Sequence, residues 1–423
     1  ITTNNVNISG FSIQNGWNGI VLDNSDGNRL FNNIINSNME DGIYLEYSDH
    51  NVISNNSLSR NKLSPYIAPN FKGNIHLFHS NYNNISENEA IWASKGIGGG
   101  YGSGILLEFS TSNRILHNEF SLNEGTGIYL RNFGGGSYDY NVIIGNNASF
   151  NNGTGIELLN SQGNMISNNT ANSNEMCGIL LWGHNVGKQD NIVVGNTVDL
   201  NELDGIDVWD AGNNKIARNI IRSNRRDGMR LVWSNYNNIT ENLVSYNDCG
   251  IRTRYDTYDN LVYHNNFVSN RIQADCMEQQ QRSWDDGYPS GGNYWSDYTD
   301  VDLYSGPYQN ETGSDGIWDH PYEIDSYPLV EPWSPKPPSP QEALEELIET
   351  IETSDLPKGT QNSLKAKLKV AIHMLDMGKE NGAIRKLTAF INRVEMLGEK
   401  TLTNEQADYL ISEAQRIIDF IEG

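Results

Sequence analysis

Aromatic rings, carboxylates and arginines recur in this sequence at positions that a β-sheet would bring to one face. They lie within or directly after a Gly–apolar–x–apolar segment that is repeated ten times between residues 19 and 270. The variable position x and the position after the second apolar residue should point away from the core. Because rings stack on the apolar faces of sugars, this pattern predicts a carbohydrate-binding face. Its predicted residues are Tyr44, Glu46, Tyr129, Trp182, Trp209 and Arg230. The other interpretation is a solvent-exposed sheet with aromatic cross-strand ladders.

The same positions offer carboxylates that a polysaccharide-cleaving enzyme would need. A glycosidase uses two carboxylates roughly 5–10 Å apart. Glu157 and Asp207 would lie two coils apart, roughly 10 Å by strand spacing, with Asp210 nearby. No acidic pair repeats on adjacent coils, so no catalytic residue is assigned. A polysaccharide lyase or glycoside hydrolase that uses this face is kept as the alternative to a structural or adhesive protein. His76 and His79 are expected to be surface histidines rather than metal ligands.

The repeat itself predicts the elements that position these side chains. Successive copies start 22 to 32 residues apart, and in six of them asparagines follow the opening residue at offsets of 9, 14 and 19, while longer coils keep the five-residue spacing. Alternating apolar residues indicate strands with one buried face. Asparagine tolerates a left-handed backbone, so we expect it to close the corners, with its amides stacked between coils. The sequence predicts a mainly β chain, a right-handed parallel β-helix with three short strands per coil and about ten coils. Longer coils carry insertions at 63–72, 93–103 and 132–140.

These coils resemble the NosD-like parallel β-helix repeats that are common on archaeal cell surfaces. The resemblance covers roughly the first 275 residues. Ser290–Tyr298, which reads S-G-G-N-Y-W-S-D-Y, resembles the module that closes many such solenoids. We therefore expect a β-helix over residues 1–278 and an aromatic, acidic capping module over 279–330.

An acidic run within the capping module resembles a calcium loop of related proteins. Its candidate ligands are Asp300, Asp302, Asp315 and Asp319. Carboxylates at alternating positions with glycine for a tight turn suit Ca²⁺. An insertion at 303–314 splits the run, so an acidic turn beside the aromatic cap is the other interpretation.

The C-terminal quarter changes both composition and period. A proline-rich linker over 331–340 leads to Ala-, Leu-, Glu- and Lys-rich sequence with a period of 3.6 residues over 341–423. Four amphipathic helices are predicted, the last with Thr403 as its N-cap. The L-P-K-G and A-D-Y-L-I segments resemble the FIMAH domain of extracellular proteins. This implies a small helical bundle that serves adhesion or docking.

Composition excludes some function classes. The chain has 423 residues and a net charge of −24, which argues against a nucleic-acid partner. No apolar run is long enough to span a membrane.

The three cysteines are expected to be free thiols. Because the chain begins at Ile1 in strand-like sequence, we expect a processed leader or an earlier segment. Sequons at Asn7, Asn84, Asn147 and Asn310 are candidate glycosylation sites, although an Asn-rich repeat produces sequons by chance.

Together these features predict an extracellular structural or adhesive protein of a surface layer, sheath or filament, in contact with glycans. Its expected partners are copies of itself or other surface proteins. Residues 1–18 would form an uncovered strand edge, which predicts head-to-tail self-association.

Overall fold

The computed structural model describes residues 1–61, 72–94, 102–132, 139–183, 188–276, 284–335, 339–354, 356–397, 402 and 404–422. The centres of the three insertions, the boundary at 278 and 279, and the N-cap predicted at Thr403 lie outside these residues. The chain forms two compact units, Ile1–Ser334 and Pro335–Gly423.

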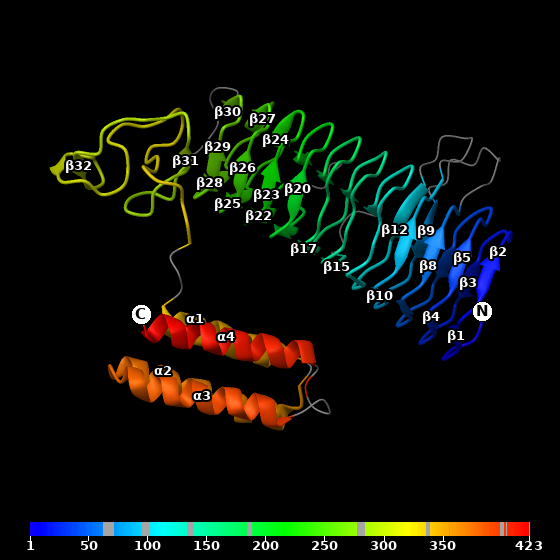
Figure 1. Ribbon diagram of the computed structural model, residues 1–423. Coiled ribbons are helices and arrows are strands. Elements are labelled where there is room, and N and C mark those ends of the chain that lie inside the picture. The colour runs from blue at the N-terminus through cyan, green and yellow to red at the C-terminus, as the bar shows by residue number, and fades with distance from the viewer. Residues whose placement is uncertain are drawn as a thin grey trace. The chain divides into compact units, whose positions relative to one another are not determined.

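The first unit is a right-handed parallel β-helix whose coils form three sheets, two of them continuous and the third interrupted in the middle coils (Figure 1). Sheet 1 is built from the Gly–apolar–x–apolar segments. Its strands are β3 (Ile20–Asp23), β6 (Ile43–Glu46), β9 (Lys72–Phe78), β12 (Gly102–Glu108), β14 (Ile128–Arg131), β16 (Ile156–Leu159), β18 (Ile179–Trp182), β21 (Ile206–Trp209), β24 (Asp227–Val232), β27 (Cys249–Arg254) and β30 (Ile272–Cys276).

Sheet 2 also contains eleven strands, all parallel. They are β1 (Asn7–Ser9), β4 (Arg29–Phe31), β7 (Val52–Ser54), β10 (Asn84–Ser86), β13 (Arg114–Leu116), β15 (Val142–Ile144), β17 (Met165–Ser167), β19 (Ile192–Val194), β22 (Lys215–Ala217), β25 (Asn238–Thr240) and β28 (Leu261–Tyr263).

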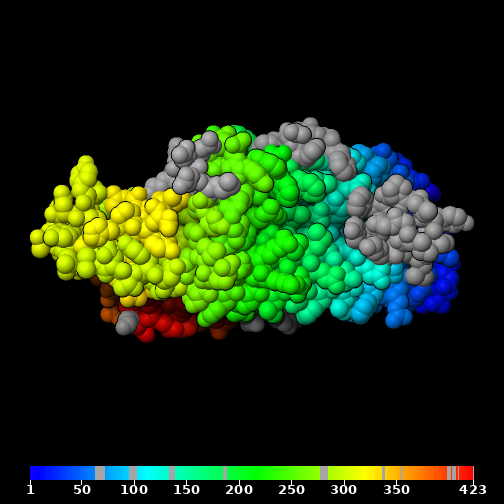
Figure 2. All heavy atoms as spheres, turned by 90° about the horizontal axis from the view of Figure 1, so that it is seen from above, coloured from blue at the N-terminus to red at the C-terminus, as the bar shows by residue number. Residues whose placement is uncertain are grey.

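Sheet 3 is interrupted, because its middle coils are joined only by single bridges at Glu119, Asn147 and Thr170. Its strands are β2 (Ser12–Gln14), β5 (Ile34–Asn36), β8 (Ser57–Ser59), β11 (Glu89–Ile91), β20 (Thr197–Asp199), β23 (Ile220–Arg222), β26 (Leu243–Ser245), β29 (Asn266–Val268) and β31 (Tyr294–Trp295). The coils follow one another as adjacent ribs along the surface, from the blue N-terminal coils to the yellow capping segment (Figure 2).

The predicted asparagine ladders are confirmed. Asn33, Asn56, Asn88 and Asn118 belong to one ladder, in which each amide donates to the next Oδ1 at 3.0 Å. The predicted left-handed asparagine corners are wrong. The left-handed residue directly precedes the ladder position, as at Asn32 (φ 54°) and Ser37 (φ 56°). The ladder side chain is buried and bonded to the neighbouring coil, so the preceding residue makes the bend.

The opening glycines are required by close packing. A Cβ on Gly205 would lie 2.5 Å from Ile221 Cγ2 and 2.6 Å from the carbonyl oxygen of Gly228. Any larger residue would push adjacent coils apart. Inside, Ile, Leu and Val from the three sheets form one continuous buried core.

The aromatic cap closes the C-terminal end of this core. Trp295 stacks on Phe267 with ring centroids 4.4 Å apart, and Trp284 stacks on Trp295 at 6.4 Å. Asn293 is the last ladder residue, and its backbone N–H donates to Asp325 Oδ2 at 2.7 Å. The rest of the cap contains a short antiparallel pair, β32 (Tyr304–Ser305) and β33 (Glu311–Thr312).

The second unit is the predicted four-helix bundle with its own apolar core. Its helices are α1 (Pro340–Thr353), α2 (Lys358–Asp376), α3 (Glu380–Leu397) and α4 (Asn404–Glu422). α1 begins with a capping box, because Ser339 Oγ accepts from the Glu342 N–H and Glu342 Oε2 accepts from the Ser339 N–H.

Candidate functional site

The predicted outward positions of sheet 1 form one row, because the strands pair in register. Tyr44 pairs with His76, Tyr129 with Glu157, and Asp207 with Arg230. The same register continues through Leu106, Leu180 and Arg252. The row divides into a charged cluster near the N-terminal end and an aromatic and arginine-rich region near the cap.

The charged cluster is centred on His76, whose side chain is buried. His76 Nδ1 lies 3.2 Å from Asp41 Oδ2, and Nε2 lies 2.8 Å from Glu108 Oε2. Burial would lower the pKa of His76, but the two carboxylates outweigh it and raise this pKa above its usual value. The surface position expected for His76 is therefore wrong.

Two further cations extend the cluster. Arg131 Nε lies 2.7 Å from Glu108 Oε1, and Lys72 Nζ lies 3.4 Å from Asp41 Oδ2. Burial opposes ionisation of Asp41 and Glu108, but the neighbouring cations hold the pKa of both below their usual values. Asp41, Lys72, Glu108 and Arg131 were not predicted as site residues.

This packing leaves few free surfaces on the predicted sugar-binding residues of the cluster. Lys72 Nζ lies 5.3 Å from the Tyr44 ring centroid, and the His76 ring lies 4.9 Å away. Tyr129 is only 5 % exposed. Glu46 is half-buried at the end of β6. His79 stacks between Tyr47 and Phe109, at 5.1 and 5.0 Å.

The region near the cap carries an aromatic row, which we define as Trp182, Trp209, Trp233 and Tyr255. Successive ring centroids are 6.1, 5.8 and 4.8 Å apart. Trp182 is 38 %, Trp233 42 % and Tyr255 61 % exposed. Trp233 and Tyr255 were missed because they follow the strands, although aromatic residues recur five positions after the opening residue, as at Tyr47 and Phe109.

Beside the row is a hollow of about 330 Å³, which we call the arginine–aspartate pocket. Its lining residues are Asp204, Arg226, Asp227, Arg230, Asp248 and Arg252. Arg230 connects the pocket to the row, because its guanidinium carbon lies 5.2 Å from the Trp209 ring centroid and Nη1 lies 3.1 Å from Asp207 Oδ2. Arg252 Nε lies 2.7 Å from Asp227 Oδ2.

Arg226 differs from the neighbouring arginines. Arg225 is paired with Glu202 at 2.6 Å, and Arg222 with Asp199 at 2.8 Å, each across adjacent coils. The residues 23 positions before and after Arg226 are Leu203 and Cys249, so neither offers a carboxylate. Among the described side chains, no carboxylate forms an ion pair with Arg226, which remains an exposed cation at the pocket.

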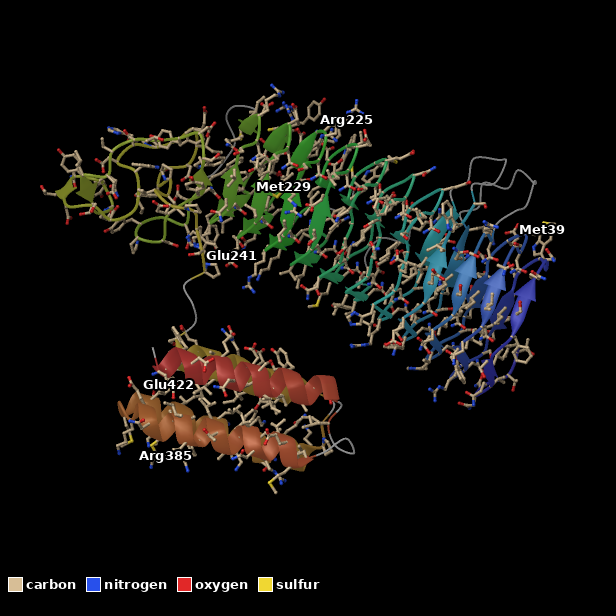
Figure 3. The ribbon with its side chains drawn as sticks, viewed as in Figure 1. Met39, Arg225, Met229, Glu241, Arg385 and Glu422 are labelled. Carbon is tan, nitrogen blue, oxygen red and sulfur yellow. The ribbon has the colours of Figure 1, made fainter. Side chains whose placement is uncertain are left out.

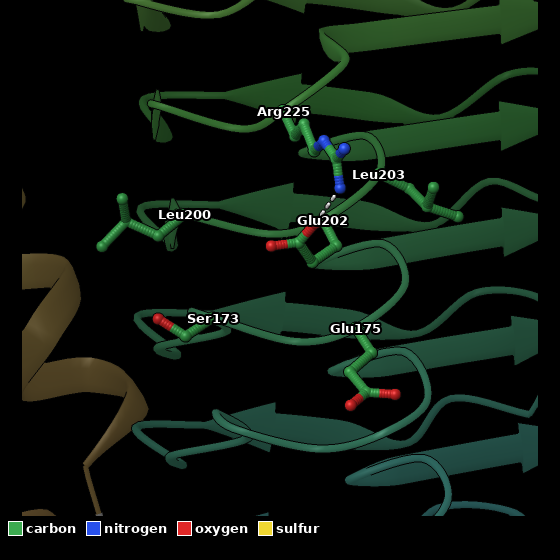
Figure 4. A pocket seen from close by; sticks show the side chains of 6 residues that line it. All are labelled: Ser173, Glu175, Leu200, Glu202, Leu203 and Arg225. Carbon is green, nitrogen blue, oxygen red and sulfur yellow. Dashed lines mark hydrogen bonds and ion pairs between the residues drawn. The ribbon is translucent and has the colours of Figure 1, made fainter.

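A second, more open hollow lies along the same edge of sheet 1. It has a volume of about 710 Å³, and Figure 4 shows its lining residues, Ser173, Glu175, Leu200, Glu202, Leu203 and Arg225. Arg225 extends from the edge of the solenoid opposite to that of Glu241 (Figure 3). Arg225 lines this hollow, and the next residue, Arg226, lines the arginine–aspartate pocket.

The three carboxylates of the enzymatic alternative are not brought together. Glu157 and Asp207 both belong to the row of outward positions on sheet 1, and Leu180 lies between them. Burial raises the pKa of each to about 7, in Asp207 despite the nearby Arg230. Asp210 lies beyond the end of β21, at the corner where the backbone is left-handed (φ 50°).

The four predicted calcium ligands instead organise turns of the cap. Asp302 accepts from the Asp315 and Gly316 N–H groups at 3.0 and 3.1 Å, and Asp319 accepts from the Leu303 and Tyr304 N–H groups. Asp300 Oδ2 lies 2.6 Å from His320 Nδ1. Asp315 Oδ1 accepts from the Ile317 N–H at 3.0 Å. The four carboxylates thus take part in turn hydrogen bonds and in one pair with His320, and the calcium site stays a prediction.

A different group of candidate metal ligands does converge. Within the described part of the chain, this group consists of Cys177, Asp204 and Asp207. Their ligand atoms all lie within 4.8 Å of one another. All three side chains are buried. Cys177 and Asp204 directly precede an opening glycine and Asp207 lies two places after one, a pattern that is visible in the sequence.

The four sequons have different environments. Asn7 and Asn310 are exposed, whereas Asn84 and Asn147 are partly buried. Asn147 Nδ2 already donates to the Glu119 carboxylate at 2.9 Å. Exposure therefore favours Asn7 and Asn310 as acceptors of a glycan. Cys177, Cys249 and Cys276 are free thiols, as predicted.

Three family models match the chain. The right-handed β-helix region matches residues 1–198, the periplasmic copper-binding protein (NosD) model matches 135–300, and the FIMAH domain matches 341–419. No curated protein matches. No helix in the described residues has the length and apolar character needed to cross a membrane.

Solved β-helix structures are similar at low identity. The A-module of mannuronan C-5 epimerase AlgE6 from Azotobacter vinelandii is 12 % identical, with a TM-score of 0.39 over 65 % of this chain and 77 % of that one. The periplasmic alginate epimerase AlgG is 16 % identical, with a TM-score of 0.37 over 64 % and 76 %. An alginate lyase from Paenibacillus sp. str. FPU-7 is 13 % identical, with a TM-score of 0.25 over 67 % and 97 %. These similarities concern the fold alone.

Proposed function

Because the chain combines a NosD-like right-handed β-helix with a C-terminal FIMAH domain, we propose that it is an extracellular adhesive protein that binds an acidic polysaccharide. The proposed binding surface is the aromatic row together with the arginine–aspartate pocket. The observation that carries the proposal is that a row of neighbouring aromatic rings and a group of paired charged side chains lie side by side and share Arg230.

The aromatic row suits an extended sugar chain. Trp182, Trp209 and Trp233 are tilted against one another by 33° and 48°, at 6.1 and 5.8 Å, which leaves apolar ring surface open between them. Trp233 and Tyr255 cover one face of each other at 4.8 Å, but both remain exposed. Sugar rings pack their C–H faces on such surfaces while their hydroxyl groups need polar partners. Arg230, Arg252 and Asp227 lie where they can exchange hydrogen bonds with those hydroxyls. Arg252 and Asp227 hold each other in place by an ion pair, and Asp207 holds Arg230.

The exposed positive charge of Arg226 favours an acidic sugar as the ligand of the pocket. The other pocket arginines, Arg230 and Arg252, have their charge compensated by Asp207 and Asp227. An unpaired guanidinium matches a carboxylate or sulfate oxyanion through paired N–H donors. A protein with a net charge of −24 would otherwise repel a polyanion, so a local cation is needed at the contact.

The helical unit would then link the glycan-binding solenoid to other surface proteins or to further copies of the chain. Its separate apolar core and the proline-rich segment before it support a docking module rather than a part of the solenoid.

We expect affinity electrophoresis in gels that contain acidic polysaccharides to reveal retardation of the chain. Combining Trp182→Ala with Trp233→Ala should weaken binding about tenfold or more, because two stacking platforms are lost. The matched controls are Trp17→Ala and Trp92→Ala, which remove rings that are 59 % and 49 % exposed elsewhere. Equal retardation of the row and control variants would contradict the proposal.

The raised pKa of Glu157 and Asp207 keeps an enzymatic function as the second candidate, since such carboxyl groups can act as general acids near neutral pH. A lyase would generate unsaturated chain ends, and a hydrolase new reducing ends, when the chain is incubated with polysaccharides that it binds. Loss of either product in Glu157→Gln or Asp207→Asn, with binding retained, would favour the enzyme over the adhesive protein.

A further inference from the structure

Cys177, Asp204 and Asp207 occupy neighbouring positions at the start of two consecutive sheet 1 strands. Cys177 directly precedes the opening glycine of one coil, and Asp204 occupies the same position in the next. Asp207 is the outward residue of β21. Coil stacking therefore brings a thiol and two carboxylates into one group whose ligand atoms lie within 4.8 Å of one another.

Asp207 supplies a second observation. Its residue is only 4 % exposed, and its Oδ1 is buried without a hydrogen-bond partner. Oδ2 is bound to Arg230 at 3.1 Å, so the side chain cannot rotate freely to satisfy both oxygens. An unpartnered buried oxygen is costly, and a cation beside Cys177 and Asp204 would satisfy it.

We propose that Cys177, Asp204 and Asp207 bind a divalent transition-metal ion of the Zn²⁺ class. Thiolate and carboxylate are both zinc ligands, and three protein ligands leave a fourth position for water or a ligand oxygen. Asp204 lines the arginine–aspartate pocket, so that fourth position is accessible. The inference does not depend on sugar binding.

Charge and geometry both fit this ion. A thiolate and two carboxylates carry three negative charges, which Zn²⁺ and Arg230 neutralise. The thiol proton would be released to solvent on binding. Zinc bond lengths place tetrahedral ligand atoms about 3.5 Å apart, so ligand atoms at the 4.8 Å limit would have to approach each other by about 1 Å.

Titration of the purified full chain with Co²⁺ tests the site, because a thiolate–cobalt bond adds a near-ultraviolet charge-transfer band and tetrahedral geometry gives strong visible bands. We expect both bands at one equivalent, and their displacement by Zn²⁺. Cys177→Ser should abolish the charge-transfer band. Asp207→Asn should weaken Zn²⁺ binding about tenfold or more in calorimetry.

Cys249→Ser is the matched control, because Cys249 is also buried directly before an opening glycine but belongs to no such group among the described residues. It should bind Co²⁺ and Zn²⁺ as the wild type does. Should Cys177→Ser fail to fold by circular dichroism, Asp204→Asn replaces it. Absence of the charge-transfer band in the wild type, or its persistence in folded Cys177→Ser or loss in folded Cys249→Ser, would overturn the proposal.

Discussion

His76 illustrates how a single outward residue can become part of a buried network. Its ring lies between Asp41 and Glu108, while Lys72 and Arg131 compensate the carboxylates. Tyr44 packs on the same ring. These contacts connect four consecutive coils, those of β6, β9, β12 and β14, so the protonation state of His76 should affect the stability of the solenoid.

The sign of this effect follows from the direction of each shift. The pKa of His76 is raised, so its contribution is fully present below about pH 6.5 and is lost as the pH rises through the folded-state pKa. The lowered pKa values of Asp41 and Glu108 give contributions that are lost as the pH falls through those values. We therefore expect the network to stabilise most strongly between about pH 5 and 6.5, and the His76 contribution to be lost as the pH rises from there through the raised pKa.

Thermal unfolding from pH 5 to 9 should then give a melting temperature that falls in the alkaline part of this range. His76→Gln should lower the melting temperature at pH 6 and flatten its alkaline decline. His50→Gln, which alters an exposed ring stacked on Tyr82, is the control. The same decline in His76→Gln and the wild type would rule out the network as its source.

At the scale of elements, the asparagine ladders hold the coils in register. Asn169 Nδ2 donates to the Ile143 carbonyl oxygen at 2.9 Å, and its Oδ1 accepts from the Asn146 N–H at 2.9 Å. Asn169→Ala should reduce the free energy of unfolding by about 2–4 kcal/mol, because buried partners on the neighbouring coils lose their bonds.

Urea denaturation measures this loss, with the exposed Asn152→Ala as the control. The control should change stability by no more than about 0.5 kcal/mol. If Asn169→Ala were equally mild, the ladder would be a consequence of coil stacking and not a source of stability.

The coils were predictable because their signal is local and repeated. Asparagine spacing and alternating apolar residues specify the strands whatever lies outside them, and Ser290–Tyr298 indicates the cap. The burial of His76 and Tyr129 was not predictable, because it depends on charged partners contributed by other coils. Cys177, Asp204 and Arg226 were missed for the same reason, since only stacking reveals what lies beside them.

At the scale of the whole molecule, the two compact units should fold independently. Leu344, Leu368, Phe390 and Ile417 belong to a core confined to the second unit. A fragment of residues 335–423 should therefore be helical by circular dichroism and melt cooperatively. A fragment without a cooperative transition would mean that the bundle needs the solenoid to fold.

The central claim is that an acidic polysaccharide binds along the outer side of sheet 1 near the cap. A crystal structure of the full chain with a bound acidic oligosaccharide tests it most directly. We expect sugar rings to stack on Trp209, Trp233 and Tyr255, and an acidic group of the sugar to bond to Arg226. Sugar bound on sheet 2 or sheet 3, or no bound sugar at millimolar concentration, would contradict it.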